Sequence, residues 1–374
     1  MCLLKLFLVF FSCDILLRLI DPVVKGMFTE LITFLVIGFL IWAYQTLKPQ
    51  SPKVCGSPNG PPVTSPRLKL SDGRYLAYKE MGVSKEKAKY RVIITHGYNS
   101  SKDLYVPLSQ ELLDEMGIYI VTFDRAGYAE SDPNPKRSVK SEAFDIQELA
   151  DQLQLGPKFY VVGLSLGAYT TWGCLKYIPN RLAGMALVVP FINPWWPSLP
   201  TKLCTEAFRK FLPRDQWGFR VAHYAPRLFW LTQKLLPSTM MMSLEDFMER
   251  NPEVYRKCDM EVLSRMSQIL MDNGHKVQQQ GVYESLYRDV MVLFGKWEFD
   301  PTELEDPFPD GEGSVHLWQG YEDGIVSFQL QRYIAQKLPW IKYHEVPGIG
   351  HMMFHDDVHC ETILRALCKE KNTL

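Results

Sequence analysis

Apolar and polar positions divide this chain into two kinds of sequence. Up to about Leu47, apolar residues run in long blocks with few polar positions between them. From Arg67 onward, short apolar runs alternate with stretches in which apolar residues recur at every third or fourth position. The first pattern is typical of a segment that meets a membrane, and the second of a globular domain.

The N-terminal 47 residues contain two apolar blocks. Charged residues interrupt Leu3–Ile20, whereas Met27–Leu47 is broken only near its start, by Glu30. As a helix rising about 1.5 Å per residue, the second block spans about 30 Å, the thickness of a bilayer's hydrocarbon core. The sequence therefore predicts a transmembrane helix at about 27–47 and a single-pass location in the secretory pathway. A cleaved signal peptide, a second span over 3–20 and either orientation stay open.

Residues 48–66 are rich in proline, glycine and serine. Proline lacks a backbone N–H and fixes φ, so such a run predicts an extended linker. The globular domain is then expected at 67–374.

The globular part begins with a predicted hairpin. Its two strands, Arg67–Leu70 and Arg74–Tyr78, flank Ser71-Asp72-Gly73, where glycine allows a positive φ. Alternating strands and helices follow. The strands are expected at 91–95, 118–123, 159–162, 185–189, 315–318 and 343–346, and the helices at 108–116, 138–155, 168–178, 328–337 and 356–368. This order predicts an α/β fold with a mainly parallel central sheet and helices on both faces.

One long stretch, about 191–308, lacks a strand pattern and carries helical patterns and many tryptophans. An insertion after the carboxyl end of a parallel strand lies over the ligand crevice. We therefore expect a helical cap at about 191–280, with 283–295 returning to the helix layer of the sheet. Trp195, Trp196 and Met240–Met242 fit an acyl pocket, a cap core or a membrane-facing patch.

Composition excludes several functions. The net charge of −1 provides no basic field for a polyanion, so we expect no nucleic-acid partner. The eight cysteines form no CxxC pair and no zinc-site spacing. Glycine-rich phosphate loops, calcium loops and HExxH motifs are also absent from the sequence. We therefore expect no cofactor and no metal.

The strongest chemical signal is Gly163-Leu164-Ser165-Leu166-Gly167, between a predicted strand and a predicted helix. A nucleophile on so sharp a turn needs strained backbone angles, and small neighbours let other chain segments approach. The pattern predicts Ser165 as a nucleophile, with Gly163 and Gly167 supporting the turn.

A second turn, His96-Gly97, follows the strand 91–95. We expect His96 to brace this loop without carrying a proton, and Gly97 to let the loop present the Tyr98 amide. With the Leu166 amide, the residue after the nucleophile, this predicts a two-donor oxyanion hole.

An acid and a base are expected in the order Ser, Asp or Glu, His. His351, in a glycine-rich loop after the last strand, is the predicted base; His344, His355 and His359 lie in a strand or on a helix. Asp323, just after the strand 315–318, is the predicted acid, and Glu322 is its competitor. Asp323 would hold the imidazole tautomer and stabilise the imidazolium.

With these motifs and the strand-end segment 124–132, the chain resembles the α/β-hydrolase superfamily over more than four fifths of its length. It is most similar to plant-type membrane-anchored esterase- or lipase-like hydrolases, with which it shares the proline-rich linker, Ser131-Asp132-Pro133-Asn134-Pro135-Lys136-Arg137 and Glu298-Phe299-Asp300-Pro301. The resemblance implies a serine hydrolase acting on a hydrophobic ester or lipid-like substrate, through a Ser-His-Asp triad and an acyl-enzyme. A non-hydrolytic ligand-binding protein and an acyltransferase stay open, because fold and triad do not fix the reaction.

Overall fold

The computed structural model describes residues 22–237 and 254–369, and its chain divides into two units at Pro49/Gln50. The expectations placed on residues 3–20 and on Met240–Met242 lie outside the described residues. The two units are treated separately below.

The described part of the N-terminal unit is mainly a long helix, α2 (Pro22–Leu47), which includes the range predicted as a span. Large apolar side chains from Met27 to Trp42 are exposed on it. Among the described residues, however, no helix is sufficiently long and apolar to cross a bilayer. The predicted transmembrane anchor is therefore not supported by the structure.

The second unit is built on an eight-stranded sheet, in the order β1-β2-β4-β3-β5-β6-β7-β8. The strands β1 and β2 form an antiparallel hairpin, β2 pairs antiparallel with β4, and the remaining pairs are parallel. This confirms the predicted mainly parallel α/β sheet. The strands are β1 (Arg67–Lys69), β2 (Tyr75–Gly82), β3 (Tyr90–Thr95), β4 (Ile118–Phe123), β5 (Phe159–Leu164), β6 (Leu182–Val188), β7 (Val315–Gly320) and β8 (Ile341–Val346).

Two helix layers cover the sheet, because side chains of each buried strand point alternately to opposite faces. One buried cluster joins one set of strand side chains, such as Ile93 and Val161, to α4 (Val139–Gln152), α5 (Tyr169–Tyr177) and α12 (Phe328–Lys337). The other cluster joins the alternate side chains, such as Ile94 and Val162, to α3 (Gln110–Met116) and α13 (Asp357–Lys369).

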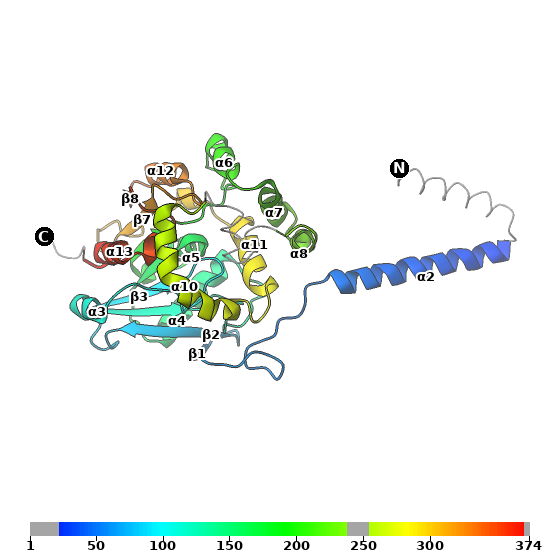
Figure 1. Ribbon diagram of the computed structural model, residues 1–374, viewed down its shortest axis with the longest axis horizontal. Coiled ribbons are helices and arrows are strands. Elements are labelled where there is room, and N and C mark those ends of the chain that lie inside the picture. The colour runs from blue at the N-terminus through cyan, green and yellow to red at the C-terminus, as the bar shows by residue number, and fades with distance from the viewer. Residues whose placement is uncertain (1–21, 238–253, 370–374) are drawn as a thin grey trace. The chain divides into compact units, whose positions relative to one another are not determined.

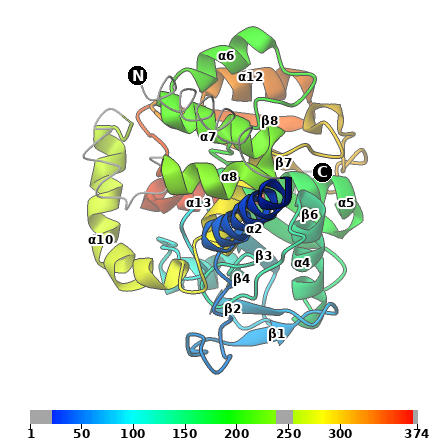
Figure 2. The same ribbon diagram turned by 90° about the vertical axis from the view of Figure 1, so that its right-hand side faces the viewer.

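The insertion after β6 is helical, as predicted, in the part that is described. It contains α6 (Thr201–Phe208), α7 (Pro213–Tyr224), α8 (Pro226–Leu235) and α10 (Lys257–Val277). Figures 1 and 2 show α6, α7 and α8 grouped together, and Figure 2 shows α10 apart from them along one flank.

A π-helical turn (Tyr283–Tyr287) leads into α11 (Arg288–Phe294). This stretch was expected to rejoin the helix layer of the sheet. In the structure, α11 packs in a third buried cluster with both Phe219 of the cap and Tyr169 of α5. Its apolar residues therefore contact the cap and the helix layer of the sheet.

The predicted linker is not a free tether along its whole length. The amide of Lys53 donates to the Gln280 carbonyl at 3.0 Å, and Cys55 is buried. The amides of Thr64 and Ser65 both donate to the Glu130 carboxylate. Prolines remove only their own donors, so the residues between them still bind the domain.

Candidate functional site

Ser165 lies at the sharp turn between β5 and the helical segment that starts with Ser165–Ala168. Its φ of +50° is in the left-handed region, which costs a residue with a Cβ free energy. A Cβ on Gly163 would lie 2.4 Å from Thr171 Cγ2, and one on Gly167 only 2.0 Å from the His96 carbonyl oxygen. Both glycines are therefore required by close approach of other groups.

The structure brings Ser165, His351 and Asp323 into one hydrogen-bonded line. The hydroxyl of Ser165 donates to His351 Nε2 at 2.8 Å, and His351 Nδ1–H donates to Asp323 Oδ2 at 2.8 Å. These donor assignments follow because an ionised carboxylate only accepts. Asp323 is buried, whereas Ser165 stays partly exposed. The line thus ends at a residue that is not fully buried.

Local amides hold the Asp323 carboxylate in place. Its Oδ1 accepts from the amides of Ile325 and Val326, each at 2.8 Å. Its Oδ2 accepts from Gln319 Nε2 at 3.2 Å, in addition to His351. The acid is therefore fixed by β7 and by the turn that follows it.

Surrounding charges raise the proton affinity of the His351 imidazole. Burial lowers the pKa of His351, but the charge and hydrogen bond of Asp323, together with the charge of Asp259, outweigh burial and raise it. The positive form of the ring is thus stabilised by negative charge within the site.

The competing residues lie elsewhere. Glu322 is exposed beside Asp323. The ring of His344 stacks on Trp318 in the sheet, and His359 pairs with Asp356. His355, expected on the terminal helix, lies in a separate 3-10 turn (Met353–His355), where its Nδ1 contacts the Tyr105 carbonyl at 2.6 Å.

The His96-Gly97 turn lies against the serine. A Cβ on Gly97 would be 3.4 Å from Ser165 Cβ. The buried ring of His96 donates through Nδ1 to the Gly97 carbonyl at 2.8 Å and accepts the Arg125 amide through Nε2 at 3.1 Å. Burial and the nearby Arg125 charge hold the pKa of His96 well below its usual value, so the ring stays neutral. It therefore braces the loop.

No sequence pattern indicated the second carboxylate of the site, Asp259, at the start of α10. Its Oδ1 accepts the Met352 amide at 2.7 Å, and a Cβ on Gly350 would lie 2.2 Å from its Oδ2. Burial raises the pKa of Asp259, although the Met352 amide and His351 act in the opposite direction. The insertion therefore supplies a buried acid directly against the loop that carries His351.

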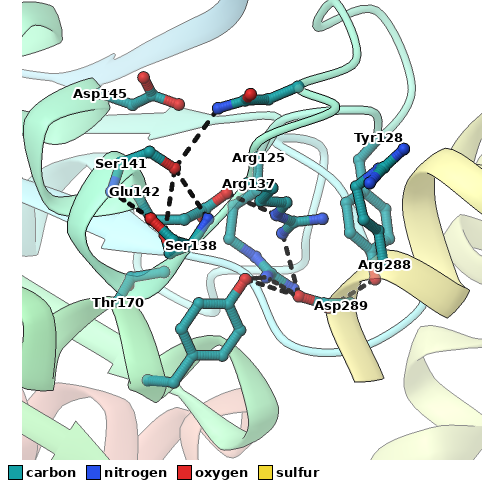
Figure 3. A network of polar contacts seen from close by, with 12 residues as sticks. Arg125, Tyr128, Arg137, Ser138, Ser141, Glu142, Asp145, Thr170, Arg288 and Asp289 are labelled. Atoms are coloured by element: carbon teal, nitrogen blue, oxygen red, sulfur yellow. Dashed lines mark hydrogen bonds and ion pairs between the residues drawn. The ribbon is translucent and has the colours of Figure 1, made fainter. Parts of the chain in front are cut away.

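A buried ionic network surrounds Asp289 of α11 (Figure 3). Asp289 of α11 accepts hydrogen bonds from Arg125 and Arg137 and from the hydroxyls of Tyr128 and Tyr169. The two arginines hold the pKa of Asp289 down at about 2, although burial acts to raise it. Arg125 belongs to the strand-end segment noted in the sequence, but neither its partner nor its burial was predicted.

A small cavity of about 20 Å³ lies between the cap and the turn after Asp323. It is lined mostly by apolar groups, including Phe191, Phe208 and Val326. The Phe191 amide donates to the Ser165 carbonyl at 3.0 Å, which ties this lining to the elbow.

The tryptophans considered for an acyl pocket do not line this cavity. Trp196 is buried in the core against Trp172 and Trp297, and Trp195 stacks on His223 within the cap. Both therefore serve packing. Across the described parts of the chain, no group of three or more His, Cys, Asp or Glu side chains is placed to hold a metal ion.

The fold agrees with comparisons to known proteins. The family model described as alpha/beta hydrolase fold matches residues 90–358. The chain therefore belongs to the α/β-hydrolase fold family.

Solved structures similar to the chain share its fold. An esterase from Thermogutta terrifontis is 18% identical with a TM-score of 0.52, covering 83% of this chain and 100% of its own. An esterase from Exiguobacterium antarcticum is 15% identical with a TM-score of 0.53, covering 82% and 100%. An α/β-hydrolase fold protein from Chitinophaga pinensis is 14% identical with a TM-score of 0.52, covering 83% and 98%.

Among curated proteins, the chain is similar to the uncharacterized protein YqjL of Bacillus subtilis (strain 168). The two are 29% identical over 105 residues, which is 27% of this chain. The match spans only 40% of that relative's length.

Proposed function

We propose that this protein is a serine hydrolase that cleaves a carboxylic ester of a hydrophobic or lipid-like substrate. Ser165 is the nucleophile, His351 the general base, and Asp323 the group that orients the imidazole. The observation that carries the proposal is the continuous line of two 2.8 Å hydrogen bonds ending at a strained, partly exposed serine. Such a line activates a hydroxyl that is otherwise a weak nucleophile.

The reaction follows from this line. As Ser165 Oγ bonds to the ester carbonyl carbon, its proton passes to His351 Nε2, and Asp323 stabilises the imidazolium that forms. The tetrahedral intermediate then collapses, and the leaving alkoxide takes the proton from Nε2. Water attacks the acyl-enzyme by the same route, which releases the acid and restores Ser165.

The amides of Tyr98 and Leu166 are proposed to hold the tetrahedral oxyanion. In support, Gly97 lies against Ser165, so the next peptide is within reach of the reacting carbonyl. Leu166 is in the first helical turn, whose N–H groups have no partner within the helix. Such donors act on charge that develops in the transition state.

Apolar surroundings support a hydrophobic acyl group. The cavity beside the Asp323 turn is lined mainly by aromatic and aliphatic side chains. Its volume of about 20 Å³ has room for one water-sized group. A long acyl chain of the substrate could therefore enter only if the cap rearranged.

The direct test is hydrolysis of p-nitrophenyl esters of graded chain length by the full chain in mild detergent. We expect turnover by the wild type and by the control variant Ser285→Ala. In the wild type, the Ser285 hydroxyl donates to the Gly281 carbonyl and takes no part in the proposed triad. Ser165→Ala should lose at least about 10³-fold in kcat. Turnover by Ser165→Ala at the wild-type rate would refute the proposal.

The membrane location predicted from the sequence stays a proposal. Its support is the row of exposed apolar side chains on α2, among them Phe34, Phe39 and Trp42. Exposed apolar surface of this extent marks a site of contact with lipid or protein. We expect the full chain to sediment with membranes, and a chain lacking residues 1–49 to stay in the supernatant. A full chain found entirely in the supernatant would contradict membrane attachment.

A further inference from the structure

One buried side chain, Arg125, holds the loop that lies against Ser165. Its Nε donates to the His96 carbonyl at 3.0 Å, and its Nη2 donates to the Gly97 carbonyl at 3.1 Å. Its own backbone amide donates to His96 Nε2. Three donors of one fully buried residue therefore fix two consecutive residues of the loop.

The Gly97 carbonyl and the Tyr98 N–H belong to one peptide unit. This unit is planar and trans, so its C=O and N–H point in opposite directions. A donor that fixes the Gly97 carbonyl on one side therefore also fixes the direction of the Tyr98 N–H on the other. The same carbonyl also accepts from His96 Nδ1, which adds a second restraint.

Arg125 is itself held by Asp289 (Figure 3). Its two terminal nitrogens donate to the two carboxylate oxygens, with Nη2 at 2.6 Å from Oδ2. Hydroxyls of Tyr128 and Tyr169 donate to the same carboxylate at 2.6 and 2.8 Å. A bidentate pair fixes the plane of a guanidinium, which a single contact to an ammonium cannot do.

We propose that Arg125, oriented by Asp289, is the positioning residue of the oxyanion hole: it fixes the Gly97–Tyr98 peptide so that the Tyr98 N–H faces the tetrahedral oxyanion formed at Ser165. The inference rests on the proposed hydrolase function and deepens it. Asp289 comes from α11 on the cap side, so the insertion helps to set the donor that stabilises the transition state.

The alternative is that the network only stabilises the fold, and Arg137 separates the two roles. Arg137 is also buried and donates to the same Asp289 at 2.9 Å. Its Nε donates to Glu142 of α4 at 2.6 Å, away from the loop. A change at Arg137 therefore disturbs the same ionic network without releasing His96 and Gly97.

The experiment compares Arg125→Lys with Arg137→Lys in the full chain, using a p-nitrophenyl ester as substrate. A lysine at 125 keeps the charge beside Asp289 but cannot donate to both carbonyls as well. We expect kcat of Arg125→Lys to fall about 10- to 100-fold, with KM within about threefold of wild type. A trifluoromethyl ketone, which forms a tetrahedral adduct with a serine, should lose affinity in parallel. For Arg137→Lys we expect a lower Tm but kcat within about threefold of wild type.

Equal losses of kcat in the two variants, or an unchanged kcat in Arg125→Lys, would overturn the inference. If Arg125→Lys does not fold, Asp289→Asn loosens the fork while keeping the shape of the side chain. It should lower kcat more than Arg137→Lys at unchanged KM, and the reverse order would overturn the inference. Failure of the hydrolase proposal looks different, because Ser165→Ala would then turn over the ester like the wild type.

Discussion

Asp323 Oδ2 and His351 Nδ1 lie 2.8 Å apart although 28 residues separate them in the chain. The contact follows from the sheet, because β7 and β8 are parallel neighbours and their carboxyl ends meet at one edge. The two loops are also tied directly, since the Glu322 amide donates to the Ile349 carbonyl at 3.1 Å. The two loops that carry the pair are therefore held together by backbone as well as side-chain hydrogen bonds.

Asp323→Asn should lower kcat by on the order of 10³- to 10⁴-fold. An amide at this position donates to Nδ1, which forces the proton of His351 onto Nε2, where it blocks transfer from Ser165. The control is Glu322→Gln, at the exposed neighbouring position, and kcat of both variants is measured with one ester. A loss in the control as large as that in Asp323→Asn would contradict the assignment of the acid.

Asp259→Asn should move the acid limb of the kcat/KM profile to lower pH. Asp323 and Asp259 together raise the pKa of His351 against burial, and His355 is a further titratable group nearby. Removing one negative charge lowers the pKa of His351, so the ring becomes neutral, and able to act as a base, at lower pH.

The matched control for this prediction is Glu261→Gln, two residues further along α10 and exposed. Its profile should coincide with that of the wild type. An acid limb that stays in place in Asp259→Asn, or moves to higher pH, would show that Asp259 does not act on the imidazole.

Gly167→Ala should reduce the free energy of unfolding by about 3 kcal/mol or more, because a methyl group there meets a backbone carbonyl at 2.0 Å. The elbow and the His96 loop would have to separate, so kcat should fall as well. Gly274→Ala is the control: it lies in α10 with nothing within 4 Å and should raise stability by about 0.5–1 kcal/mol. Urea unfolding followed by circular dichroism measures the free energy of unfolding of both variants. A wild-type free energy of unfolding in Gly167→Ala would contradict the close approach of the His96 carbonyl.

Local patterns were sufficient to predict the order of strands and helices. The run Phe159–Val162 and the glycines around Ser165 predicted the strand and its turn, because both depend on residues that are adjacent in the chain. His351 could be proposed as the base and Asp323 as the acid, because parallel strands bring the carboxyl ends of β7 and β8 together.

The remaining parts of the site depend on contacts that no local pattern encodes. Asp259 begins a helix in the insertion, and nothing in its neighbours indicates that it meets Met352, 93 residues further on. Arg125 and Asp289 are 164 residues apart and meet only when α11 packs on the cap side of the elbow. The proline-rich stretch also looked unpaired, because its partner Glu130 lies 66 residues beyond Thr64.

The most direct measurement is covalent labelling of the full chain with a fluorophosphonate, followed by intact-mass and peptide mass spectrometry. The account predicts one adduct per chain, located on Ser165, lost in Ser165→Ala and strongly slowed in His351→Gln. An unlabelled wild-type chain, or labelling that persists in Ser165→Ala, would show that this hydroxyl is not an activated nucleophile.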